Sequence, residues 1–109
     1  MQQVPLDSSP NQNFDITLFV NGKNVDFNLF FSWNNTAKYW TMDIRDKSKK
    51  PLACNIPLYA NANLLAGLEY LEIGSVFLIK LSDINADTPD LNTINTDFAL
   101  LWGDNVDVD

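Results

Sequence analysis

The sequence predicts an all-β protein, a small single-domain antiparallel barrel or sandwich of six to seven strands. First, the chain has 109 residues, which is the size of one domain. Second, apolar and polar residues alternate over several short segments, and third, turn signals separate those segments. We divide the chain into an extended N-terminal arm over 1–13, a β domain over 14–103 and an acidic tail over 104–109.

The arm is polar and contains Pro5 and Pro10, which discourage regular structure around them. After it, apolar residues at every second position of 14–20 indicate a strand. Asn21-Gly22 is the preferred pair for a two-residue type I′ turn. The alternation resumes over 24–33, so 14–33 is predicted to form a hairpin.

The rest of the chain supplies further short strands. Pro57 suggests that the fourth strand lies at a sheet edge or carries a bulge. The near-continuous apolar run at 75–81 is typical of a strand buried on both sides. The predicted strands are 38–45, 52–59, 69–73, 75–81 and 96–102, with 60–68 left open between a helical turn and a loop and 82–95 expected as a long loop.

Charge excludes several functions. Residues 1–54 hold six Lys/Arg and five Asp, a balance of +1, whereas residues 55–109 hold Lys80 against nine acidic residues, a balance of −8. Nucleic-acid and anionic membrane surfaces require Lys and Arg, so neither is expected as a partner. With no apolar run long enough for a signal or a membrane span, we expect synthesis in the host cytoplasm.

Catalytic and cofactor chemistry are poorly supported. The chain has no His, so no Ser-His-Asp or Cys-His arrangement exists. Its single cysteine, Cys54, is interpreted as a small buried residue. Paired carboxylates such as Glu69 with Glu72 are interpreted as solubilising charges. We therefore expect no enzyme and no cofactor.

A calcium loop is a further alternative. Asp83, Asn85 and Asp87 have the spacing of its first ligands, but Thr88 and Ile94 stand where such a loop needs Gly and Glu. We therefore expect no metal site.

Aromatic residues suggest a docking surface. Phe19 and Phe30 fall on the polar face of the predicted hairpin, where an apolar pair is typical of a docking patch. Trp33, Trp40 and Trp102 follow the apolar alternation and are interpreted as core residues.

Several phrases, in order, make the chain resemble the phage baseplate plug proteins, including those of cyanophages. The first two are Val4-Pro5-Leu6 and Pro10-Asn11-Gln12-Asn13-Phe14. The others are the segments 39–44, 51–52, 55–58 and 63–65, so the resemblance spans 4–103. It departs from the family's pattern at 92–97 and at Cys54.

The resemblance implies a virion protein of a contractile tail baseplate, located near the hub and spike and helping to close the tube end. Its partners would be hub and spike or tape-measure proteins, with self-association within the assembly left open. We predict that the arm binds a partner rather than joining the core. The predicted partner-binding residues are Pro5, Pro10, Asn11, Gln12, Phe19 and Phe30.

Two alternatives remain at this point. A carbohydrate-binding β module would require some of the three Trp side chains to be exposed as a sugar platform. A small hydrolase or metal-dependent enzyme would require one of the carboxylate groupings above to form a site.

Overall fold

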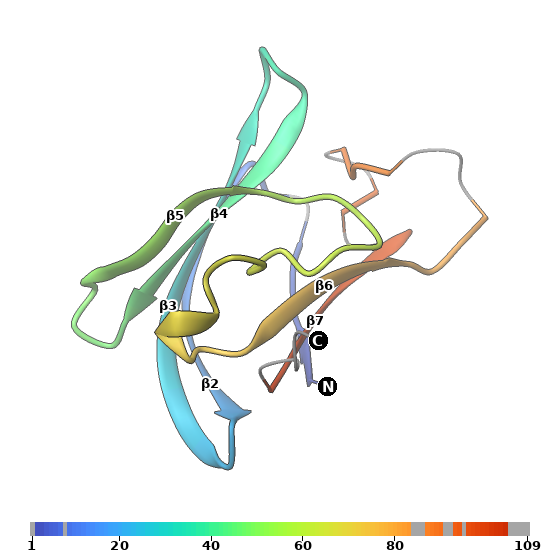
Figure 1. Ribbon diagram of the computed structural model, residues 1–109. Coiled ribbons are helices and arrows are strands. Elements are labelled where there is room, and N and C mark those ends of the chain that lie inside the picture. The colour runs from blue at the N-terminus through green and yellow to red at the C-terminus, as the bar shows by residue number, and fades with distance from the viewer. Residues whose placement is uncertain (1, 8, 84–86, 91–92, 95, 105–109) are drawn as a thin grey trace.

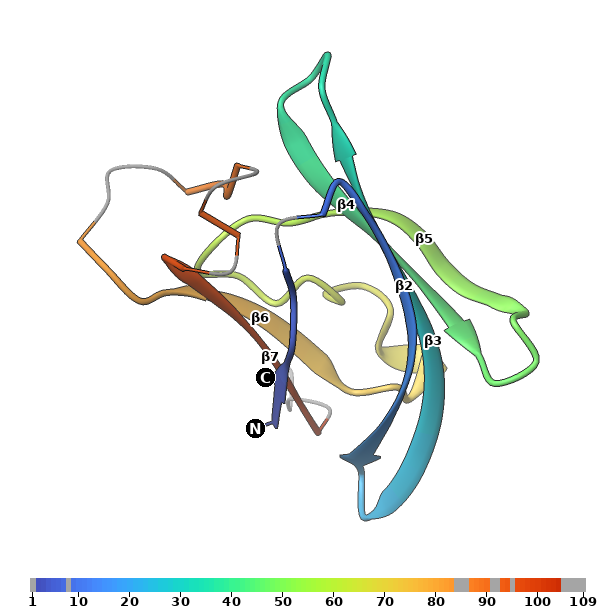
Figure 2. The ribbon, with the colours of Figure 1, turned by 180° about the vertical axis from the view of Figure 1, so that it is seen from behind.

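The computed structural model describes residues 2–7, 9–83, 87–90, 93–94 and 96–104. Over these residues the chain forms seven strands in two open antiparallel sheets, so the all-β prediction is confirmed and the sheets do not close into a barrel. The larger sheet has the order β2-β3-β4-β5, and the smaller has the order β1-β7-β6. Figures 1 and 2 show the two sheets facing each other.

The larger sheet is a meander built on the predicted hairpin. It consists of β2 (Asn11–Val20), β3 (Lys23–Asn34), β4 (Tyr39–Asp46) and β5 (Pro51–Pro57). Asn21 and Gly22 have φ angles of 53° and 85°, so the predicted type I′ turn between β2 and β3 is confirmed. The register is Val20 opposite Lys23 and Phe14 opposite Leu29.

The smaller sheet joins the two ends of the described chain. It consists of β1 (Gln2–Val4), β6 (Ser75–Lys80) and β7 (Phe98–Gly103), with β7 in the middle. Val4 lies opposite Leu100 and is buried. The prediction of an arm that stays outside the core is therefore wrong for this stretch. The cause is non-local, because the pairing partner of β1 lies at the other end of the sequence.

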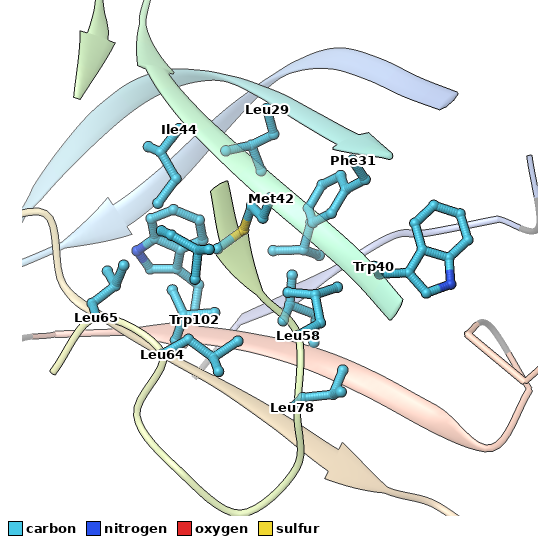
Figure 3. Close-up of a cluster of buried hydrophobic side chains, with 14 of the residues drawn as sticks. Leu29, Phe31, Trp40, Met42, Ile44, Leu58, Leu64, Leu65, Leu78 and Trp102 are labelled. Atoms are coloured by element: carbon cyan, nitrogen blue, oxygen red, sulfur yellow. The ribbon is translucent and has the colours of Figure 1, made fainter. Parts of the chain in front are cut away.

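The core lies between the two sheets (Figure 3). Trp40 and Trp102 are completely buried, as predicted, whereas Trp33 is only half-buried. The ring of Trp102 lies 5.0 Å from that of Phe27 on the facing sheet, and its Nε1 donates to the carbonyl oxygen of Ile73 at 2.7 Å. The indole thus fills the core without leaving its polar atom unpaired.

Two element predictions need correction. Residues 69–73 are not a strand, because Glu69–Leu71 forms a single 3-10 turn, η1. The strand at 75–81 is not fully buried on both sides, since Phe77 and Ile79 are half-buried. The open segment 60–68 is mostly turns, and its bridges from Ala60 to Leu78 and from Asn63 to Phe77 lie against β6.

Candidate partner-binding surface

The connection between β1 and β2, together with the first two residues of β2, carries four of the predicted partner-binding residues and is held by Gln12. The buried side chain of Gln12 accepts a hydrogen bond from the Asp7 amide at 3.0 Å. Its Nε2 donates to the carbonyl oxygens of Asp7 and Ser9, at 2.6 and 3.1 Å. Gln12 therefore fixes the loop from inside, and its side chain is not displayed to a partner.

Two of the exposed members of the same group, Pro5 and Asn11, line a hollow. Pro5, Pro10 and Asn11 are exposed, and the Pro10 carbonyl accepts a hydrogen bond from the Trp33 amide at 2.9 Å. The hollow has a volume of about 570 Å³. Its lining residues are Pro5, Leu6, Asp7, Ser9, Asn11, Gln12, Asn13 and Phe14. The structure thus brings three of the six predicted residues to one concave surface.

Apolar side chains form the floor of this hollow. Leu6 and Phe14 pack against the core but remain half-buried. The ring of Phe14 stacks on that of Phe31 with a centroid distance of 5.9 Å. Asp7 is the only charged residue among the described residues that line the hollow. The surface therefore combines two half-buried apolar side chains with one exposed carboxylate, which suits an apolar side chain flanked by a cation.

The outer edge of β2 borders the hollow and has unpaired backbone groups. Val20 and Lys23 flank a two-residue turn, so they form a hydrogen-bonded pair. In an antiparallel ladder the next residue along the strand then points its N–H and C=O away from the partner strand. Asn13, Asp15 and Thr17 are in this outward class.

Phe19 belongs to the same class and shows the geometry directly. Its amide donates to the side-chain Oε1 of Gln2 at 2.9 Å, and its carbonyl accepts from Nε2 of Gln2 at 2.7 Å. The Gln2 amide thus pairs with the edge as a peptide group of a neighbouring strand would. This contact also joins β1 of one sheet to β2 of the other.

The two aromatics predicted as a pair lie apart. The side chain of Phe19 is 55% exposed, near the β2–β3 turn. Phe30 lies opposite Asn13 of β2, and Asn13 precedes Phe19 by six residues in that strand. The two aromatic residues are therefore separated by about 20 Å along the strand direction. Phe30 is half-buried under the Arg45 guanidinium, whose carbon lies 5.6 Å from the ring centroid. The expectation of one apolar patch formed by both rings is therefore wrong.

A buried amide lies on the outer face of the same hairpin. The side chain of Asn28 is 2% exposed, and its Nδ2 donates to Oδ1 of Asn13 at 2.9 Å and to Oδ1 of Asp15 at 2.8 Å. Its Oδ1 is buried without a hydrogen-bond partner in the described structure. The sequence analysis missed Asn28 because alternation places it on the solvent side.

The sequence predictions about Cys54 and about the calcium loop have different outcomes. Cys54 is exposed, so its assignment to the core is wrong. Asn85 of the supposed calcium loop lies outside the described residues, and Asp87 forms an ion pair with Lys80 at 2.9 Å. The part of the chain that the structure describes contains no group of three or more residues able to hold a metal ion. It also contains no helix long and apolar enough to cross a membrane.

The two-sheet β domain can be compared with known protein families. A family model described as "Cyanophage baseplate Pam3 plug gp18" matches residues 1–105. The chain therefore belongs to this family of baseplate plugs and is a virion structural protein of the tail baseplate. No curated protein sequence matches the chain.

Proposed function

We propose that the protein is a plug-like component of a contractile tail, packing against hub and spike or tape-measure proteins at the tube end. The match of a baseplate plug family over residues 1–105 carries this proposal. The surface supports it, because the β1–β2 connection, which is hydrogen-bonded to Gln12, presents exposed prolines next to a hollow lined by Leu6 and Phe14. A preorganised surface of this kind loses little conformational entropy on binding.

We also propose that the role is purely structural and that the protein is made in the host cytoplasm before assembly. The chain has no His to act as a general base. Its one thiol is free and exposed, which is compatible with a reducing compartment.

Co-expression with the other proteins of the same baseplate tests the structural proposal. We expect the protein to co-elute with a hub, spike or tape-measure protein at a fixed ratio, measured by size exclusion and light scattering. A species of 12.3 kDa that elutes alone in every combination would contradict the proposal.

Two exposed aromatics provide a matched pair of variants for this assay. Phe19 lies at the β2 edge, whereas Tyr70 lies in η1 and is 76% exposed. Neither belongs to the core, so both substitutions should preserve the fold. We expect Phe19→Ser to weaken co-elution and Tyr70→Ser to leave it unchanged.

A further inference from the structure

The outer edge of β2 differs from the other sheet edges in being both regular and open. The edge of β6 is occupied by the preceding segment, whose Leu64 amide donates to the Val76 carbonyl at 2.8 Å and whose Asn61 amide donates to the Leu78 carbonyl at 3.2 Å. The strand β1 has only three residues. Among the described strands, β2 thus offers a ten-residue edge whose outward groups are paired only at Phe19.

We propose that the edge of β2 at Asn13, Asp15 and Thr17 receives an extended segment of another baseplate protein by strand addition. This inference rests on the proposed function, which supplies the partner. Each of the three residues directs an N–H and a C=O outward, so the incoming backbone can form a ladder of alternating donors and acceptors. The Gln2 amide on Phe19 already occupies the next place in that ladder.

The side chains around the edge define the chemistry of the incoming segment. Side chains of an added strand alternate between the two faces of the sheet. Those turned inward would enter the hollow and cover Leu6 and Phe14, which are half-buried, so they should be apolar. Those turned outward would lie near Asp15, so Lys or Arg is expected there, and the exposed Asp7 that lines the hollow adds a second negative charge nearby.

Two observations favour a different protein over a second copy of this chain. Antiparallel pairing of two β2 edges would bring the Asp15 carboxylates of both chains to one face, where like charges destabilise the pair. The Oδ1 atom of Asp15 already accepts a hydrogen bond from Asn28, so the carboxylate is held in place to meet a cation. A basic segment removes the repulsion that a second copy would create.

Amide hydrogen exchange in the co-expressed baseplate complex tests the proposal residue by residue. In the free protein, the outward amides of Asn13, Asp15 and Thr17 should exchange fast and the inward amides of Phe14 and Ile16 slowly. In the complex, we expect the three outward amides to slow by about tenfold or more, so that the alternation disappears. Outward amides that still exchange fast in a stable complex would overturn the strand-addition proposal but leave the proposed function intact.

Two substitutions at Asp15 separate the contribution of backbone hydrogen bonds to partner binding from the contribution of charge. Asp15→Pro removes one outward donor, together with the carboxylate that accepts from Asn28, and places the ring on the open edge, while the β2–β3 ladder keeps all its bonds. We expect this variant to weaken binding to the co-eluting partner by about tenfold or more. The matched variant Asp15→Asn keeps the donor and removes the charge, so a loss of about threefold is expected.

The remaining outcomes also decide the question. Equal losses for both variants would overturn the backbone contact, because only Asp15→Pro changes the edge. Concentration-dependent protection of the same amides in the isolated protein would identify a second copy as the occupant and overturn the proposed partner. If no baseplate protein co-elutes with the wild type, the proposed function is wrong, and the proposal that a baseplate protein occupies the β2 edge is wrong with it.

Discussion

The two outer edges of the four-stranded sheet are built in opposite ways. The edge strand β5 begins and ends with proline, at Pro51 and Pro57, and its pairing with β4 has two register irregularities. Asn55 within it has a φ of 58°. The edge strand β2 pairs with β3 in unbroken register from Asn11 to Val20.

The difference shows that the chain blocks one edge and leaves the other available. Prolines and bulges are the devices by which natural sheets prevent unwanted pairing with another chain. They are present in β5, as the sequence analysis predicted from Pro57. In β2 they are absent over ten residues, and Gln2 pairs with only one of them. An edge that keeps its regular geometry is the one suited to a specific partner.

The largest effect should come from placing proline at an inward position of β2. Ile16 lies opposite Phe27 in the hydrogen-bonded class, so Ile16→Pro removes a bond between β2 and β3 and truncates a side chain that packs on the core. We expect a loss of about 3 kcal/mol in the free energy of unfolding, measured by urea denaturation. The outward variant Thr17→Pro serves as the control and should cost less than about 1 kcal/mol, because the Thr17 side chain is bonded only to Asp26 at an exposed position. Equal losses would show that the assigned alternation of β2 is incorrect.

A smaller loss is expected at the neighbouring strand of the other sheet. Val4 is 1% exposed and pairs with Leu100 in β7. Val4→Ala should lower the free energy of unfolding by about 2 kcal/mol, because it removes two buried methyl groups and leaves a cavity. Gln3→Ala, at an exposed position of the same strand, should be neutral. A neutral Val4→Ala would restore the view of residues 1–13 as an arm outside the core.

The hairpin of β2 and β3 and the short strand β1 show what the sequence can and cannot predict. The hairpin 14–33 was predictable because its alternation and its Asn21-Gly22 turn are local signals. The strand β1 was not, since three residues carry no periodicity and pair with residues almost a whole chain length away. The burial of Asn28 likewise depends on the side chains that surround it, Asn13 and Asp15 among them.

The candidate site shows which part of a surface a sequence can indicate. The phrase Pro10-Asn11-Gln12 drew attention to this region through its resemblance to baseplate plugs, and its role in partner binding stays a prediction. Only the structure shows that Gln12 turns inward to hold Asp7, while its neighbours remain exposed. The role of Gln2 was equally inaccessible, because its contact with Phe19 joins two sheets.

A modest effect is expected from opening the one occupied position of the β2 edge. Gln2→Ala removes both side-chain hydrogen bonds to the Phe19 backbone. These bonds are exposed to water, which replaces them, so the loss should be about 1 kcal/mol or less. Faster hydrogen exchange of the Phe19 amide is the expected readout, with the Leu18 amide as an internal control. Unchanged exchange at Phe19 would mean that Gln2 does not occupy the edge in solution.

The smallest effect on stability should be found at Cys54, on the blocked edge. Between the pairs Met42–Ile56 and Ile44–Ala53, β5 has one more residue than β4, and this bulge turns Cys54 outward. The Asn55 amide freed by the bulge donates instead to Oδ1 of Asp43 at 2.8 Å.

Cys54→Ser should therefore change the free energy of unfolding by less than about 0.5 kcal/mol. In the native wild type, the thiol should react with a disulfide reagent nearly as fast as in urea, because no core opening is needed to reach it. A thiol that reacts only after unfolding would place Cys54 in the core, as strict alternation requires. The bulge would then be absent, and only the two terminal prolines and the second register irregularity would distinguish the edge of β5 from that of β2.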